Sequence, residues 1–360
     1  MRIFIDKKNI ENMPLDAYKK SCGAALDSLW ETGWIRMAIS KSDRKPLSAL
    51  QEIADRLAYQ SSVVLVIAEG AAGRMIRGLT DAVPGRSDRA SVEVFGDTLS
   101  SVDYARLLDR LESEDFSILA VTEGKEGVPW RGAFACLKKL LITKYGPEAA
   151  AARICGIAGK NSDVLAKDAA DNDYPLINWP EGISAAAGAG TAAALLPLAV
   201  KGVNLEEYLD GFYDMLADPA WDLDGTDYGA ARAIWQKEHG GGENLMIWQR
   251  QLLGLGKWRD GSHTIWMPEE QALDRKADFA AMLIVEMDEE DVMMPYFEGC
   301  NEDGSLNLLL KETADRYFRR DDMAERSVKI SVERLDSYSL GHLAAFLQLS
   351  DGITDFLLKK

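Results

Sequence analysis

Residues 61–82 read SSVVLVIAEGAAGRMIRGLTDA, a short apolar run that breaks at glycine and continues directly into an amphipathic pattern. The run predicts a buried strand, and the apolar residues at helical spacing after it predict a helix. Further strands are expected in ASVEVFGD, DFSILAVTEG and RICGIAG, with helical patterns between them. Strands that alternate with helices of this length predict a mainly parallel sheet with helices on both faces.

The second half of the chain has the same α/β character. The stretch ISAAAGAGTAAALLPLAV predicts a helix of small residues that approaches another element closely, with a flexible Gly/Ala linker as the alternative. Further strands are expected in DFAAMLIVEM and RSVKISVERL, and an apolar helix in SLGHLAAFLQLSDGITDFLLKK. At 360 residues the chain is long enough for two packed domains.

Composition excludes several classes of partner. The net charge is −17, so the surface repels nucleic acid and anionic lipid. No strongly apolar run is long enough for a membrane span, and the N-terminal residues lack a signal-peptide core, which predicts a cytoplasmic protein. The four cysteines are scattered without metal-ligand spacing, so we expect buried reduced thiols, no metal and no cofactor.

The other polar and aromatic groups suggest few sites. His263, in RDGSHTIW, is a weak candidate for a general base, and a histidine in a surface turn is the simpler interpretation. Asp222, Asp224 and Asp227 lack the spacing of a calcium loop, which favours a solvated acidic loop. Tryptophans between residues 221 and 266 could line a sugar platform, but packing in the core or a subunit interface explains them better.

Four patches in order along the chain resemble phosphoglucose isomerases of the bacterial type. They are VEVFGDTLSSVDYARLLDRLESEDFSILAVTEGKEG with the helix after it, WPEGISAAAGAGTAAALLPLAVKGVNLEEYLDGF, RQLLGLGK and YSLGHLAAFLQLSDGITDFLL. The resemblance implies two SIS-type (sugar isomerase) three-layer α/β/α domains, and a homodimer with its site at the subunit interface. The expected division is a helical segment at 1–45 packing on the second domain, a first domain at 46–185, and a second at 186–360.

The resemblance places phosphate-binding positions in two loops. The family's first loop, G-I-G-G-S, matches AEGAA: Gly70 is retained, Ala72 replaces the serine, and Glu69 enters the turn. The family's second loop, S-K-S-G-T-T, matches TEGKEG. There Thr122 stands for the first serine and Gly124 for the second.

The charges of the second loop also differ from the family's. Glu123 occupies the basic position, Glu126 and Gly127 replace the threonines, and Lys125 is the one cation left in the loop. At about 5 Å and an effective dielectric near 20, two unit negative charges repel by roughly 3 kcal/mol, and a carboxylate repels a phosphate dianion by twice that. A retained hydroxyl returns about 1–3 kcal/mol, so these carboxylates are expected to exclude a phosphate.

The catalytic positions differ as well. The segment that carries the family's arginine aligns with Ser184–Ala187, which places Ala186 at the arginine. The family's glutamate motif, E-S-x-G-K, is shortened to GLGK and has no carboxylate. Lys257 and His263 are then the weak candidates for a role in catalysis. The family's catalytic lysine lies beyond the last helix, and this sequence stops at LLKK.

Three functions remain open on these residues. The first is a relative of the isomerases that has lost or greatly weakened the interconversion of glucose 6-phosphate and fructose 6-phosphate, a step of glycolysis and gluconeogenesis, and that acts in binding or regulation. The second is an active isomerase with relocated catalytic residues. The third is a binder of a neutral or cationic sugar-like ligand, which Glu69, Glu123 and Glu126 would suit better than a phosphate.

Overall fold

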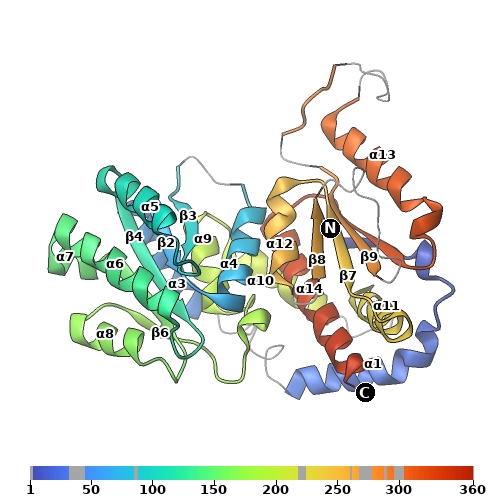
Figure 1. Cartoon of the computed structure of the whole chain (residues 1–360), viewed down its shortest axis with the longest axis horizontal. Coiled ribbons are helices and arrows are strands. Elements are labelled where there is room, and N and C mark those ends of the chain that lie inside the picture. The colour runs from blue at the N-terminus through green and yellow to red at the C-terminus, as the bar shows by residue number, and fades with distance from the viewer. Residues whose placement is uncertain are drawn as a thin grey trace. The chain divides into compact units, whose positions relative to one another are not determined.

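The computed structural model describes residues 3–31, 45–84, 88–217, 224–259, 262–266, 278–287, 290–295 and 304–359. The chain divides into two compact units (Figure 1). Residues 32–209 form what we call the central unit, and residues 1–31 with 210–360 form the terminal unit. The boundary falls within helix α10 (Leu205–Ala217).

The central unit contains a five-stranded parallel sheet of order β3-β2-β4-β5-β6. Its elements are α3 (Lys45–Tyr59), β2 (Val63–Ile67), α4 (Gly70–Ala82), β3 (Ser91–Phe95), α5 (Ser101–Ser113), β4 (Phe116–Thr122), α6 (Val128–Tyr145), α7 (Pro147–Ala151), β5 (Ile154–Ala158), α8 (Val164–Asn172), β6 (Leu176–Asn178), the 3-10 helix η2 (Ala185–Ala187) and α9 (Ala192–Val200). The sequence predicts β2, β3, β4 and β5 but not β6.

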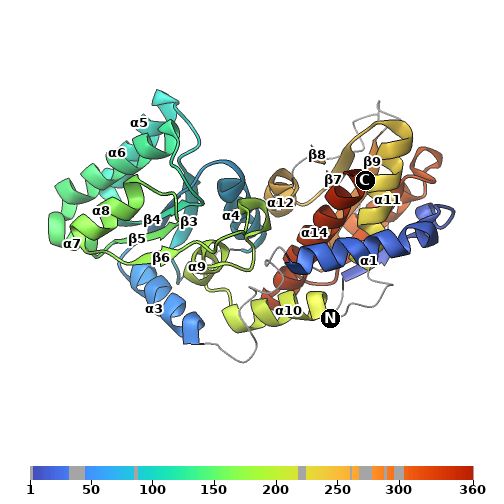
Figure 2. The ribbon, with the colours of Figure 1, turned by 90° about the horizontal axis from the view of Figure 1, so that it is seen from below.

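Helices cover both faces of this sheet because alternate strand residues point to opposite sides. Val63, Leu65 and Ile67 of β2 pack in one apolar core with α5, α6 and α8. On the other face α3 contacts β2, and α4 and α9 contact β3 (Figure 2). Because α9 packs against α3 and α4, residues 186–209 group with the central unit, whereas the sequence boundaries place them in the second domain.

The terminal unit has a five-stranded sheet of order β1-β10-β9-β7-β8, in which the edge strand β1 alone among these strands is antiparallel. Its elements are β1 (Ile3–Asp6), η1 (Lys8–Ile10), α1 (Leu15–Glu31), α11 (Asp224–His239), β7 (Glu243–Ile247), η3 (Arg250–Leu252), α12 (Leu253–Trp258), β8 (Ser262–Trp266), β9 (Phe279–Val285), α13 (Leu306–Phe318), η5 (Asp321–Met323), β10 (Ser327–Val332) and α14 (Ser337–Leu358). The sequence predicts β9, β10 and α14.

Helices also pack on this second sheet. The helix α11 contacts β9, α14 contacts β1, and α1 packs on both α11 and α14. The helix α13 packs against β9 and β10, where Met282, Ile284 and Tyr317 share a core. The N-terminal segment, which the sequence assigns to helix, contributes β1 as well as α1. Among the described residues, no helix combines the length and apolar character needed to cross a membrane.

Candidate functional site

The candidate site lies at the carboxyl edge of the central unit's sheet. Strand β2 has β3 on one side and β4 on the other. The chain therefore adds β3 at one edge of β2 and the later strands at the other edge, and the strand order reverses between β2 and β4. In open parallel sheets, ligands bind in the crevice beyond the carboxyl ends of the strands at such a switch point. Two loops border this crevice, residues 68–70 after β2 and residues 123–127 after β4. They are the loops that the sequence resemblance assigns to phosphate.

Glu69 joins the two loops at this switch point by bonding to the opposite loop. Its Oε1 accepts a hydrogen bond of 2.6 Å from the backbone N–H of Gly127, the residue that caps the N-terminus of α6. A Cβ atom on Gly127 would lie 2.5 Å from Glu69 Oε2, so glycine at this position permits the close approach. The carboxylate therefore lies at the positive end of α6, where a bound anion would be favoured.

The turn between β2 and α4 has the geometry expected of it. Gly70 begins α4 with a φ of +58°, in the left-handed region that glycine adopts without steric cost. Ala72, in the first turn of α4, is buried. It presents a methyl group where the family resemblance expects a serine hydroxyl.

Thr122 and Lys125 contribute little to the crevice. The Thr122 hydroxyl donates to the carbonyl of Gly124 at 2.8 Å. Its proton therefore serves a bond within the loop and is not offered to a ligand. Lys125 is exposed, and it makes no hydrogen bond or ion pair with the described residues.

Glu126 is buried at the N-terminus of α8. Its Oε1 accepts from the Ser162 hydroxyl at 2.5 Å and from the Leu165 N–H at 3.0 Å, and its Oε2 accepts from the Val164 N–H at 3.4 Å. Burial alone would raise the pKa of this carboxyl, but the hydrogen bonds from Leu165 and Ser162 hold the pKa below its usual value. Glu126 is an ionised cap of α8.

Glu123 is the third carboxylate of these loops. Its Oε2 accepts from the N–H of Ala185 at 3.0 Å, at the start of η2, the turn that contains Ala186. Its backbone is also confined, because a Cβ on Gly159 would lie 1.7 Å from the Glu123 carbonyl oxygen. The sequence treats Glu69, Glu123 and Glu126 as free charges around a cleft, whereas in the structure each accepts a backbone N–H.

The two weak candidates belong to the terminal unit. Lys257 lies in α12 and is exposed. His263 lies in β8, opposite Asn244 of β7, and therefore in a strand rather than the surface turn that the sequence predicts. The position of its side chain lies outside the described part of the structure. Within the described residues, no group of three or more His, Cys, Asp and Glu side chains is arranged to hold a metal ion.

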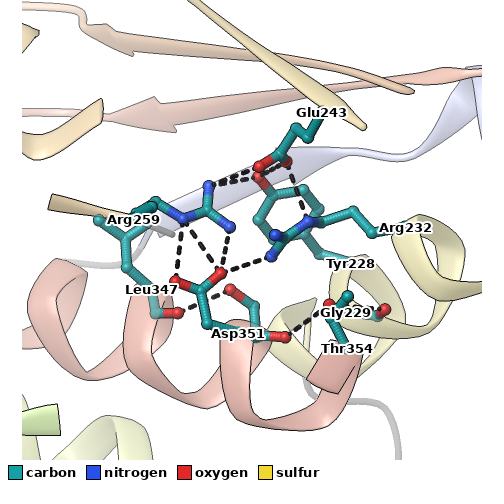
Figure 3. Close-up of polar contacts among 9 residues, drawn as sticks. Tyr228, Gly229, Arg232, Glu243, Arg259, Leu347, Asp351 and Thr354 are labelled. Carbon is teal, nitrogen blue, oxygen red and sulfur yellow. Dashed lines mark hydrogen bonds and ion pairs between the residues drawn. The ribbon is translucent and has the colours of Figure 1, made fainter. Parts of the chain in front are cut away.

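A second polar cluster, which the sequence analysis does not identify, lies inside the terminal unit (Figure 3). Arg259 pairs with Asp351 at 2.5 Å and with Glu243 at 3.2 Å. Arg232 pairs with the same two carboxylates at 2.6 and 3.2 Å. Tyr228 donates to Glu243 and accepts from Arg259. The two arginines balance the two carboxylates, and all four but the partly exposed Asp351 are buried, which indicates a structural role for the cluster rather than a ligand site.

No family model matches the chain. By sequence it is 25% identical over 375 residues to the glucose-6-phosphate isomerase of Clostridium tetani, covering 91% of this chain and 82% of that protein. It is 23% identical to the enzyme of the same name from Staphylococcus saprophyticus, covering 98% and 87%. The fold is similar to those of a hypothetical protein from Thermus thermophilus (TM-score 0.84, 18% identity, covering 99% and 94%) and a glucose-6-phosphate isomerase from Chlamydia trachomatis (TM-score 0.70, 13% identity, covering 98% and 83%).

Proposed function

We propose that this chain, a homologue of the bacterial glucose-6-phosphate isomerases with two SIS-type α/β domains, has lost or greatly weakened the interconversion of glucose 6-phosphate and fructose 6-phosphate. It would act instead as a binding or regulatory homologue. We also propose a homodimer in the cytoplasm, by analogy with the family. Light scattering on the purified protein tests the dimer.

The observation that carries this proposal is the bond between Glu69 and Gly127. A sugar phosphate entering the switch-point crevice would meet a carboxylate that is already bonded to the N-terminus of α6. At about 5 Å the repulsion between a carboxylate and a phosphate dianion amounts to roughly 6 kcal/mol at an effective dielectric near 20. Displacing the carboxylate would also break its hydrogen bond to Gly127.

The chemistry of proton transfer supports the same proposal. Aldose–ketose isomerisation needs a base that removes a proton beside the carbonyl and groups that stabilise the enediolate. Where the family resemblance expects a glutamate, α12 contributes Leu255, Gly256 and Lys257. Where it expects an arginine, η2 contributes Ala186.

A coupled isomerase assay tests the proposal directly. The chain is purified from a host that lacks its own glucose-6-phosphate isomerase and is assayed in both directions. We expect no turnover above a blank prepared from the same host. Turnover that falls in the Lys257→Ala or His263→Ala variant would contradict the proposal and favour an active enzyme with relocated residues.

A further inference from the structure

A hollow of about 420 Å³ opens on the central unit beside the candidate crevice. It lies beyond the carboxyl ends of β4, β5 and β6, and its volume falls within the range of small-molecule sites. The groups that matter for recognition are Glu123, Lys160, Asn161, Trp179, Glu181 and Ser184.

The walls of this hollow are held in place by the fold. The Trp179 indole N–H donates to the Ile183 carbonyl at 2.8 Å, which closes the turn that forms one wall. The Trp179 backbone N–H donates to the carbonyl of Ala158 at the end of β5, also at 2.8 Å. On the opposite side, Gly159 lies against the backbone of Glu123. The backbone of these walls is therefore ordered before a ligand binds, which favours binding.

The charges of the hollow favour a cation over an anion. Lys160 and Glu181 form an exposed pair at 3.2 Å, so their opposite charges add no net charge to the lining. Glu123 is left as the unbalanced charge of the lining, and of its two oxygens only Oε2 accepts a hydrogen bond from a described residue. Oε1 is thus available to an ammonium group, and an anion would be repelled.

Neutral polar groups accompany this carboxylate. The Asn161 amide and the Ser184 hydroxyl are exposed, and neither side chain bonds to a described residue. An amide and a hydroxyl offer both donors and acceptors, which is the complement that a polyhydroxylated ligand requires. The backbone of the Glu181–Ser184 turn adds further polar atoms to the same wall.

We propose that this hollow binds a hydroxylated amine of monosaccharide size, with its ammonium group on Glu123 Oε1 and its hydroxyls on Asn161 and Ser184. This inference deepens the proposed function, on which it rests for a binding role, and it places the ligand beside β5 and β6 rather than between the two loops that Glu69 joins. Of the three carboxylates of the candidate site, Glu126 bonds to the N-terminus of α8 and Glu69 to that of α6. Glu123 is therefore the carboxylate that we assign to the ligand.

Calorimetric titration of the full chain tests the proposal with glucosamine, N-acetylglucosamine and glucose 6-phosphate as probes. We expect glucosamine to bind, N-acetylglucosamine, which lacks the positive charge, to bind more weakly, and glucose 6-phosphate not to bind. Absence of glucosamine binding, or equal binding of glucosamine and its acetylated form, would overturn the proposal. These outcomes leave the isomerase assay unaffected, so the two proposals can fail separately.

Glu123→Gln is the decisive variant because its amide keeps an oxygen for the N–H of Ala185 while losing the charge. We expect glucosamine affinity to fall about tenfold or more, as when a charged hydrogen bond is lost. Glu148→Gln, at an exposed carboxylate of α7 near the amino edge of the sheet, is the matched control and should bind as the unchanged chain does. Unaltered affinity in Glu123→Gln, with its circular dichroism spectrum unchanged, would refute the role of Glu123.

Discussion

Arg259 donates two hydrogen bonds to one carboxylate oxygen of Asp351: Nη2 lies 2.5 Å and Nε 3.1 Å from Oδ1. The side chain of Arg259 is 1% exposed and that of Asp351 30% exposed, so the pair lies at the boundary of the interior. With Arg232 and Glu243 it joins α11, β7, α14 and the residue after α12 in a neutral network (Figure 3).

Removing one carboxylate from this network should be costly. Among the described residues, Asp351→Ala leaves the two buried arginines with Glu243 as the one carboxylate that pairs with them, and an uncompensated buried charge costs about 3–5 kcal/mol of unfolding free energy. Because Asp351 is partly exposed, we expect about 3 kcal/mol, measured by urea unfolding. The matched control is Asp322→Ala, which breaks an exposed pair with Arg320 and should cost under about 1 kcal/mol. Equal losses in the two variants would contradict a structural role for the network.

The cap that Glu126 places on α8 should make stability depend on pH. Its hydrogen bonds with Leu165 and Ser162 outweigh burial and lower its pKa in the folded chain below the usual value of 4.5. The stabilisation is therefore fully present above that value and is lost as the pH falls through the lower folded pKa. We expect Glu126→Gln to lose about 1–2 kcal/mol at pH 7, and this difference from the unchanged chain should shrink below pH 4.5.

Unfolding curves measured in urea between pH 3 and pH 7 would follow this difference. Glu52→Gln, at an exposed carboxylate in the middle of α3, is the control and should match the unchanged chain throughout the series. If the loss of unfolding free energy in Glu126→Gln stays constant across the series, the charge of Glu126 does not stabilise the cap, and the loss comes from the change in side-chain hydrogen bonding or packing.

The local elements could be predicted where pattern and breaker residues agree. The apolar run before Glu69 and the glycine after it define β2 and the start of α4. Gly146, with a φ of +81°, ends α6 where the sequence places its end. By contrast β6 is three residues long, and all five residues of β7 are buried, so neither strand gives an alternating signal.

The partners of the site's carboxylates could not be predicted because they come from distant segments. Glu69 bonds to a residue 58 positions away and Glu126 to one 39 positions away, and the identity of such partners depends on the sheet order. One signal of the buried network is present in the sequence: Asp351 lies in a mainly apolar helix, α14, four residues before a second acidic residue, Asp355. An acidic side chain is rarely buried unless it is paired, so a carboxylate in a mainly apolar helix indicates a partner.

Gly159, which lines the hollow, and Gly124, which follows Glu123 in the neighbouring loop, offer a matched pair of substitutions. A Cβ at residue 159 would lie 1.7 Å from the carbonyl oxygen of Glu123, and backbone cannot swing aside as a side chain can. We expect Gly159→Ala to cost about 3 kcal/mol or more. No heavy atom lies within 4 Å of a Cβ at residue 124, so Gly124→Ala should change stability by less than about 0.5 kcal/mol. Thermal unfolding of both variants measures the difference, and similar midpoints would mean that the loops do not meet.

Glu69 should determine whether the crevice accepts an anion. Glu69→Ala frees the N–H of Gly127 at the N-terminus of α6, and backbone N–H groups at such a terminus bind phosphate. We expect phosphate to raise the melting temperature of this variant while leaving that of the unchanged chain within error, with chloride used to match ionic strength. Phosphate at ten times its dissociation constant would add about 1.4 kcal/mol.

Glu69→Gln separates the charge of this side chain from the space it fills. The amide keeps an oxygen on the N–H of Gly127, so it still occupies the position of an anion while carrying no charge. If occupancy keeps phosphate out, Glu69→Gln should gain much less from phosphate than Glu69→Ala does. If repulsion alone keeps it out, the two variants should gain equally. Phosphate that stabilises the unchanged chain as much as Glu69→Ala would contradict both explanations, because the crevice would then be open with its carboxylate in place.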